Sequence, residues 1–462
     1  MNIIKTSVIA AAAITIVGCG SDSDSTPTTQ VRVTHASPDA PLVEIKANGS
    51  VVSGLGNVDY QESSGVITLD AGTYDFSVDA KLPGVQTVQV LDLAGTNLAA
   101  DMRYDVIAID NVDLSGASPT IQGSVIARSS TAPSGDMARL SVLHAHPTAG
   151  AVDVYLTTDA TLDQASPTLD DFAFTDTFSG EVPMGDVRIR VTGPDDKTVL
   201  FDTGEAAINL ASGSDTIVVA TENTRVGEST SPLTLLAGFG TAALSPVYSS
   251  TENATVRVAH SVFGLGGVDV NASGSAVDGL VNITFPTDVT ISNFRSKDLP
   301  GATAFDLTVS PTGDPSTVAI DLGSQTFDAG SETTVFAVGN ADGDPEAISA
   351  LPIVDDMRSV SAYAKVRVVH AHPEAGLVDI HAVAAGGDFD TTTVVVAGVN
   401  FKDFTEEHLI INAGMYDLAV AEAGTTNVLL SLNGADLTGG LVATVFATEN
   451  GIKVNVDNSS GN

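Results

Sequence analysis

Histidine recurs in this sequence at the end of one repeated pattern. The pattern is clearest from Val366 to Ile380 (VRVVHAHPEAGLVDI), where alternating apolar residues lead into His, a turn, and a second alternating run with an acidic residue. Similar copies begin at Val31, Leu140 and Val256. The first histidines of the four copies are His35, His144, His260 and His370. They are the residues best placed to do chemistry.

Two kinds of chemistry fit these histidines. Each first histidine is in phase with the apolar side chains of its strand, which predicts a half-buried imidazole that bonds the backbone of the following turn. Two copies add a second histidine two positions later, a spacing that zinc sites use. The predicted zinc ligands are His144, His146 and Asp153 in the second copy, and His370, His372 and Asp379 in the fourth. Because copies one and three lack the second histidine, the structural role is favoured, with zinc or a switch near pH 6 as alternatives.

The acidic residues of the pattern indicate no specific chemistry. Glu44, Asp153, Asp269 and Asp379 are out of phase with the apolar residues around them. We expect them to face solvent or to pair with Arg32, Arg257 or Arg367. Two acidic loops, residues 340–346 and 193–196, are candidate calcium sites. Neither has the spacing of an EF-hand, so an ordinary Asp/Gly/Pro turn explains them more simply.

No enzyme motif is present. The sequence lacks a nucleophile elbow, a phosphate loop, a zinc-protease motif and a dinucleotide fingerprint. It has one cysteine, no tryptophan and 5% aromatic residues, which argues against a thiol enzyme and against aromatic sugar-binding platforms. We therefore expect no enzymatic activity, and a hydrolase assembled from distant residues is only the third hypothesis.

The excess of acidic residues limits the classes of partner that the chain can bind. The chain has 19 basic and 57 acidic residues, a formal net charge of -38. Nucleic acid and anionic lipid surfaces require clustered Lys and Arg, so neither is an expected partner. Solubility in a salty medium is the simplest explanation of the acidity.

The first residues carry an export signal. Lys5 precedes a short apolar run, and the run ends in Ile16-Val17-Gly18-Cys19, which resembles a bacterial lipobox. We expect a signal peptide over 1–18, lipidation of Cys19 and a polar tether over 19–30. Gly20 follows the cysteine where Asp would resemble an inner-membrane retention signal, so we expect an outer-membrane lipoprotein, on its periplasmic face or the cell surface.

The elements that position the histidines form four repeats. The first histidines are 109, 116 and 110 residues apart, a period that matches an immunoglobulin-sized β-sandwich. The fold class expected is all-β, with four immunoglobulin-like antiparallel β-sandwich domains in tandem after the signal peptide. The predicted domains are 31–126, 138–248, 255–350 and 365–457, with candidate linkers at 127–137, 249–254 and 351–364. We expect a rod or a bent string of separate domains.

The motifs also support a family resemblance. The pattern VRVxHAxPxAxxVDV, a Gly-containing turn such as AGMYDLAV, and a last apolar strand ending in Asn resemble the bacterial domain-of-unknown-function family 4397. The resemblance covers nearly all of residues 31–457 and is weak in the third repeat. It implies tandem immunoglobulin-like sandwiches in an exported protein, and the family carries no established activity.

Together these features predict an exported, lipid-anchored surface protein that acts as a non-enzymatic structural, adhesion or envelope-interaction module. The expected partners are the membrane, through Cys19, and an envelope or extracellular protein or glycan. No cofactor is expected. The alternative is a metal- or glycan-binding surface module, with zinc at the His-Xaa-His pairs or calcium at the acidic loops.

Overall fold

The computed structural model describes residues 26–84, 86–112, 121–158, 161–205, 208–225, 229–285, 294–301 and 303–458. Every regular secondary-structure element in these ranges is a β-strand. The described residues include no helix with the length and hydrophobicity that a membrane span requires. The predicted signal peptide and Cys19 lie outside the described residues. The predicted tether is too long, because the first strand begins at Thr28.

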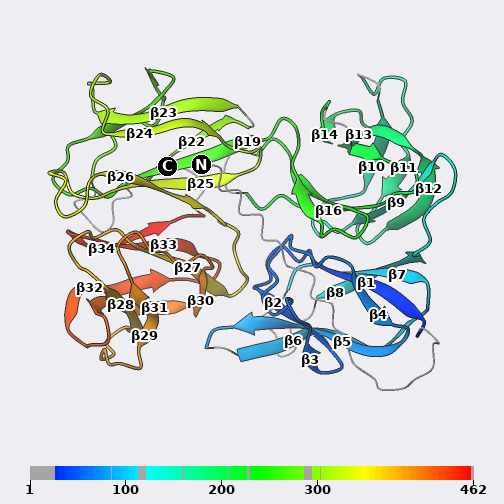
Figure 1. Cartoon of the computed structure of the whole chain (residues 1–462), viewed down its shortest axis with the longest axis horizontal. Coiled ribbons are helices and arrows are strands. Elements are labelled where there is room, and N and C mark those ends of the chain that lie inside the picture. Colours follow the sequence, from blue (N-terminus) through cyan, green and yellow to red (C-terminus); the bar gives the residue numbers. More distant parts are fainter. Residues whose placement is uncertain are drawn as a thin grey trace. The chain divides into compact units, whose positions relative to one another are not determined.

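The strands form eight sheets, and each repeat contributes two (Figure 1). We call the sheet that carries the histidine strand the first sheet of its repeat, and the other the second sheet. Apolar side chains from both sheets of a repeat meet in one core, as Val31 of the first sheet and Phe76 of the second do in repeat 1. The all-β prediction is confirmed, and the eight sheets pair into about four sandwich-like units.

The first sheets have a common strand order. In repeat 1 the order is β4 (Ile67–Asp70), β1 (Thr28–His35), β7 (Met102–Ile109), β8 (Gln122–Ser129). In repeat 2 it is β12 (Thr177–Pro183), β9 (Met137–His144), β16 (Asp215–Glu222), β17 (Leu233–Phe239), β18 (Ser245–Val247). In repeat 3 it is β22 (Phe294–Pro300), β19 (Asn253–His260), β25 (Glu332–Val338), β26 (Ser349–Val354). In repeat 4 it is β30 (Leu409–Asn412), β27 (Tyr363–His370), β33 (Val442–Thr448), β34 (Gly451–Val456).

The second sheets carry the acidic strand of the pattern. In repeat 1 the order is β3 (Ser50–Val51), β2 (Val43–Ala47), β5 (Gly72–Leu82), β6 (Gln86–Leu98). In repeat 2 it is β11 (Leu169–Phe172), β10 (Val152–Thr157), β13 (Gly185–Thr192), β14 (Val199–Asp202), and β15 (Ile208–Leu210) also pairs with β13. In repeat 3 it is β21 (Ser275–Ala276), β20 (Val268–Ala272), β23 (Ala304–Pro311), β24 (Ile320–Thr326). In repeat 4 it is β29 (Val394–Val399), β28 (Val378–Ala384), β31 (Gly414–Glu422), β32 (Val428–Leu437).

The first sheets are mixed, which corrects the prediction of purely antiparallel sandwiches. Each histidine strand pairs in parallel with the apolar strand near the end of its repeat: β1 with β7, β9 with β16, β19 with β25, and β27 with β33. Parallel neighbours need a long crossover, and here the chain supplies it by building the second sheet before it returns. The apolar strand predicted to close each repeat is followed by one more antiparallel strand, such as β8 after β7.

All three predicted linkers are partly strand. Residues 127–129 complete β8, residues 253–254 begin β19, and residues 351–354 complete β26. The linkers were predicted from composition, and Ser, Thr, Ala and Pro occur in edge strands as well as in linkers.

The chain divides into two compact units, and each holds two repeats. Unit 1 comprises 1–223 and 230–250, and unit 2 comprises 224–229 and 251–462. Within unit 1 the outer faces of the two first sheets form a shared apolar cluster that includes Ile107 and Ile126 of repeat 1 with Leu143 and Ile217 of repeat 2. Within unit 2, Phe336 and Phe446 meet edge to face with ring centroids 5.6 Å apart. Repeats paired in this way are not separate beads, so that expectation is wrong within each unit.

Candidate functional site

The four first histidines make the same pair of hydrogen bonds. Nε2 donates to the carbonyl oxygen six residues later, and Nδ1 accepts the amide two residues later. The carbonyl bonds run from His35 to Pro41 (3.2 Å), His144 to Gly150 (3.2 Å), His260 to Gly266 (3.0 Å) and His370 to Gly376 (3.0 Å). The amide donors are Ser37, His146, Val262 and His372, at 3.2–3.3 Å. Because an amide always donates, Nδ1 is the acceptor, and the imidazole is the neutral tautomer with its proton on Nε2. We call this arrangement the histidine clasp.

An aromatic ring completes each clasp. The rings of Tyr60, Phe174, Phe285 and Phe401 meet the clasp histidine of their repeat edge to face, with centroids 6.3–6.5 Å apart. Sequence reasoning missed these aromatics. Each follows its histidine at a broadly similar separation in a chain with few aromatic residues, and that recurrence was the available signal.

Burial sets the charge state of the clasps. The exposed fractions of the four histidines are 0–2%. Removal from water lowers the pKa of His144, His260 and His370, and the bond to the carbonyl only partly opposes this effect. A neutral imidazole that bridges two backbone groups therefore fixes the turn between the two sheets, and the ring is fully buried where the sequence predicted a half-buried one.

The predicted zinc ligands are not brought together. In repeat 2, Nε2 of His146 lies 3.2 Å from the Pro232 carbonyl and Nδ1 accepts the Ala149 amide at 3.2 Å, so both nitrogens contact backbone. Asp153 instead accepts the Asp171 amide at 3.0 Å. In repeat 4, Nδ1 of His372 accepts the Glu374 amide at 3.3 Å. Among the residues that the structure describes, no three His, Cys, Asp or Glu side chains are grouped to hold a metal ion.

The acidic residues of the pattern bind loop amides rather than arginine, which corrects the predicted pairing. Asp379 accepts the amides of Gly398 at 2.8 Å and Gly424 at 2.7 Å, and it is buried. Asp269 accepts the amides of Asn282 and Gly313 at 2.7 and 2.9 Å. These amides hold the pKa of both carboxyls below the usual value. Glu44 differs, because its carboxylate pairs with Lys46 at 2.7 Å.

The acidic loops proposed for calcium are self-bonded turns. In the first loop, the Asn340 side-chain amide donates to the Asp344 carbonyl at 2.6 Å, and the Asp344 amide donates to the Asp342 carboxylate at 3.2 Å. In the second, Asp196 accepts the amide and the hydroxyl of Thr198, both at 3.0 Å. Such bonds are those of ordinary Asp turns.

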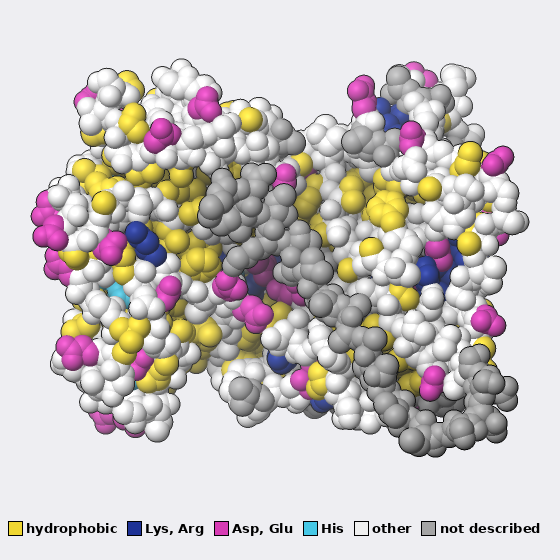
Figure 2. Space-filling view, viewed as in Figure 1, with side chains coloured by type: hydrophobic (Ala, Val, Ile, Leu, Met, Phe, Trp, Pro, Cys, Tyr) yellow, Lys and Arg dark blue, Asp and Glu magenta, His cyan; other side chains and the backbone are white. Residues whose placement is uncertain are grey.

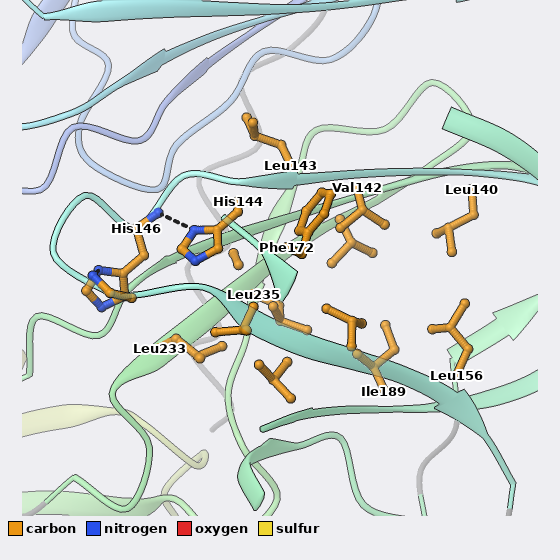
Figure 3. A pocket seen from close by; sticks show the side chains of 16 residues that line it. Leu140, Val142, Leu143, His144, His146, Leu156, Phe172, Ile189, Leu233 and Leu235 are labelled. Atoms are coloured by element: carbon orange, nitrogen blue, oxygen red, sulfur yellow. Dashed lines mark hydrogen bonds between the residues drawn. The ribbon is translucent and has the colours of Figure 1, made fainter. Parts of the chain in front are cut away.

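The cavity in the core of repeat 2 is too small for a metabolite. It has a volume of about 30 Å³ and is lined by apolar side chains, with the rings of His144 and Phe172 at its wall (Figure 3). Pockets for small molecules have volumes of roughly 300–1,000 Å³. A groove of about 310 Å³ lies in repeat 4 beside Lys402, Asp403 and Glu406.

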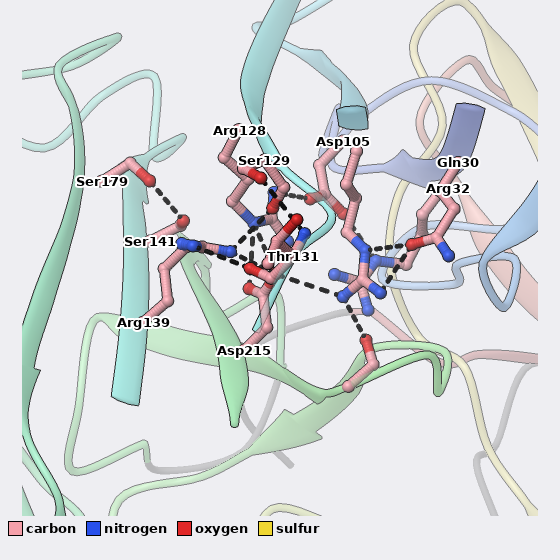
Figure 4. Close-up of polar contacts among 12 residues, drawn as sticks. Gln30, Arg32, Asp105, Arg128, Ser129, Thr131, Arg139, Ser141, Ser179 and Asp215 are labelled. Carbon is pink, nitrogen blue, oxygen red and sulfur yellow. Dashed lines mark hydrogen bonds and ion pairs between the residues drawn. The ribbon is translucent and has the colours of Figure 1, made fainter. Parts of the chain in front are cut away.

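Unit 1 holds a buried network of arginine and aspartate between its two repeats (Figure 4). Asp105 accepts Nε of Arg32 at 2.5 Å and also pairs with Arg128. Asp215, from repeat 2, accepts Nε of Arg128 at 2.9 Å and Nη1 of Arg103 at 3.2 Å. Nη1 of Arg139 lies 3.6 Å from the same carboxylate. We call these six residues the arginine cluster.

Unit 2 has a corresponding network with reciprocal contacts. Arg257 of repeat 3 pairs with Asp457 of repeat 4 at 2.7 Å, and Arg367 of repeat 4 pairs with Asp355 of repeat 3 at 2.5 Å. Burial opposes the charge of Arg257, but the two carboxylates raise its pKa overall. Sequence reasoning missed both networks, because the partners come from different repeats and are far apart in the chain.

Burial of basic side chains, in these networks and elsewhere, changes what the surface presents. About half of the chain's 19 basic residues are buried: Arg32, Arg103, Arg128, Arg139, Arg190, Arg257, Arg358, Lys365, Arg367 and Lys453. Most of the 57 acidic residues are outside the buried set. Figure 2 accordingly shows many Asp and Glu side chains and few Lys and Arg on the visible face.

Comparisons with known proteins identify a family and no activity. No curated protein matches the chain. Among solved structures, "The Bacillus anthracis TIE protein" is 9% identical, with 91% of this chain and 68% of that chain covered and a TM-score of 0.16, too low to support a statement about fold. A family described as "Domain of unknown function (DUF4397)" matches residues 29–155 and 254–381. The second match includes all of repeat 3, where the resemblance was expected to be weak. Each match covers one repeat and continues into the second strand of the next, and over more than half of its length the chain is a member of this family of unknown function.

Proposed function

We propose that this protein is an exported, lipid-anchored module of the bacterial envelope that acts without catalysis, as a spacer, scaffold or adhesion surface. Its four sandwiches are immunoglobulin-like in this proposal, and Cys19 is the acylated residue at the end of a cleaved signal peptide. The outer membrane is the proposed location. The partner is an envelope or extracellular protein or glycan.

The observation that carries the proposal is how the chemistry-bearing side chains are used. The clasp histidines bond backbone, the carboxylates of the pattern bond loop amides or a lysine, and the buried arginines join repeats. Each of these contacts stabilises the scaffold. The acidic surface supports solubility, and screening in a salty medium keeps the cost of its like charges low.

The test of the anchor uses Cys19→Ser with Ser21→Ala as the matched control. Cells expressing each chain are fed an alkyne-labelled fatty acid, and the membranes are then fractionated. We expect label and outer-membrane fractionation for the wild type and the control, and neither for Cys19→Ser. A chain that stays labelled after loss of Cys19 would refute the anchor.

The test of the non-catalytic role uses the purified chain carrying Cys19→Ser. It is incubated with generic ester, glycoside and peptide substrates at neutral pH. We expect no turnover above buffer. Turnover that co-purifies with the chain and is lost on unfolding would replace the proposal with a hydrolase.

The partner is sought by photo-crosslinking on intact cells, with the crosslinker on exposed acidic loops of unit 1 and unit 2 in turn. We expect the same envelope component from several preparations. Crosslinks only between copies of the chain would contradict a separate partner and would indicate that the protein associates with itself.

A further inference from the structure

The arginine cluster of unit 1 carries an excess of positive charge. Four guanidinium groups, of Arg32, Arg103, Arg128 and Arg139, face two carboxylates, of Asp105 and Asp215. All six side chains belong to buried residues, with exposed fractions of 0–9%. Arginine does not lose its proton in proteins, and an unbalanced buried charge is costly. The cluster therefore needs more negative charge than its own residues supply.

Backbone carbonyl oxygens, which carry no net charge, accept several of the arginine N–H donors. Nη1 of Arg32 donates to the Ala242 carbonyl at 2.7 Å, and Nη1 of Arg103 donates to the Gly240 carbonyl at 3.0 Å. Arg139 donates to the carbonyls of Ser129 and Thr131. Two buried donors have no partner among the described residues: Nη2 of Arg32 and Nη2 of Arg128. Both belong to arginines that already share Asp105.

Unit 2 provides an internal comparison. There, two arginines, Arg257 and Arg367, face two aspartates, Asp355 and Asp457. Nε of Arg367 also lacks a partner among the described residues, but here each of the two arginines has a carboxylate to pair with, and the neighbouring Lys365 pairs with Asp356. An unpaired donor with matched charge is satisfied by water, whereas unpaired donors beside excess positive charge favour an anion.

We propose that unit 1 binds a small inorganic anion of the halide class at Nη2 of Arg32 and Nη2 of Arg128. Chloride is the expected physiological ligand. A single spherical anion needs only a few N–H donors, and the two unpartnered guanidinium edges beside Asp105 can supply them. Phosphate and carboxylate ligands are larger and would need a pocket.

The first experiment measures thermal unfolding of the chain carrying Cys19→Ser at constant ionic strength, while sodium chloride replaces sodium gluconate. An anion bound only by the folded state raises the midpoint in proportion to the logarithm of its concentration. Well above the dissociation constant, each tenfold increase is worth about 1.4 kcal/mol, or roughly 3–6 °C for a unit of this size. A midpoint that does not respond to chloride would overturn the proposal.

The matched variants are Arg32→Gln in unit 1 and Arg367→Gln in unit 2. We expect Arg32→Gln to lose the chloride dependence and Arg367→Gln to keep it. Loss in both, or in neither, would contradict the assignment to unit 1.

A measurement on the unmutated cluster decides the matter if Arg32→Gln does not fold. Crystals of the Cys19→Ser chain grown with sodium bromide should show one anomalous peak within contact distance of Arg32 and Arg128. Density there without an anomalous signal would mean water at both donors, and the proposal would fail.

Discussion

Replacing the clasp histidine of repeat 4 tests the structural interpretation most directly. His370→Ala removes two hydrogen bonds to backbone, each worth about 1 kcal/mol net, and leaves the Gly376 carbonyl and the His372 amide without the ring. It also removes a fully buried ring that packs against Phe401, and large-to-small changes of buried residues cost roughly 2–5 kcal/mol. Together these effects predict a loss of about 4 kcal/mol or more in the free energy of unfolding.

The matched control is His372→Ala. This side chain is partly exposed and its ring accepts one amide, from Glu374, so its loss should cost less than about 1 kcal/mol. The two histidines would be ligands together in a zinc site, and that hypothesis predicts similar effects for both variants and a dependence on zinc. The pair of variants therefore separates a clasp from a metal site.

The assay is urea unfolding followed by far-ultraviolet circular dichroism, since the chain has no tryptophan. Each variant is measured in chelator and again with zinc. A His370→Ala chain with an unchanged midpoint would refute the clasp. Equal losses for the two variants, seen only with zinc present, would restore the metal site.

Three further outcomes follow from the same contacts. Burial lowers the pKa of the first histidines of repeats 2 to 4. Their contribution to the free energy of unfolding is therefore complete above the unfolded pKa near 6.5 and is lost as pH falls through their folded pKa values. Urea midpoints should accordingly drop between about pH 7.5 and pH 6. Asp105→Asn should cost about 3–5 kcal/mol, because it leaves buried arginines unpaired, whereas the exposed Asp101→Asn should cost under about 0.5 kcal/mol in the same urea assay. Asp379→Asn should cost about 1.5–3 kcal/mol at pH 7 and progressively less as pH falls below the usual carboxyl pKa near 3.8, and an effect independent of pH would contradict the charged bonds to Gly398 and Gly424.

The period-two pattern was sufficient to predict the strands and the inward face of each histidine. Val366 and Val368 lie in the core of repeat 4, as their phase predicts, and His370 follows them at the end of β27. The pairing of repeats was harder to see. Its signal was present in strands that are apolar in both phases, such as Phe336 and Ala337 of β25, which are buried on opposite faces of one sheet.

The partners of the polar side chains could not be predicted, for a geometric reason. Arg128 meets Asp215 across an interface between repeats, and no local spacing encodes that approach. The carboxylate of Asp379 was expected to face solvent or to lie beside an arginine, because the residue is out of phase with the apolar side chains around it. Instead, loop amides of Gly398 and Gly424 come within reach, and two N–H donors satisfy a buried carboxylate without a second charge.

The face-to-face pairing of repeats has a consequence for how such proteins grow. The two family matches start at corresponding points, Thr29 and Ala254, and each unit joins one matched repeat to the repeat that follows it. A repeat without its neighbour would present the apolar outer face around Ile107 or Phe336 to water, together with arginines such as Arg103 or Arg367 that have lost the carboxylate of the other repeat. We therefore expect gain or loss of a single repeat to destabilise such a chain, and its gene to lengthen or shorten in steps of two. Relatives of this chain should carry even numbers of repeats.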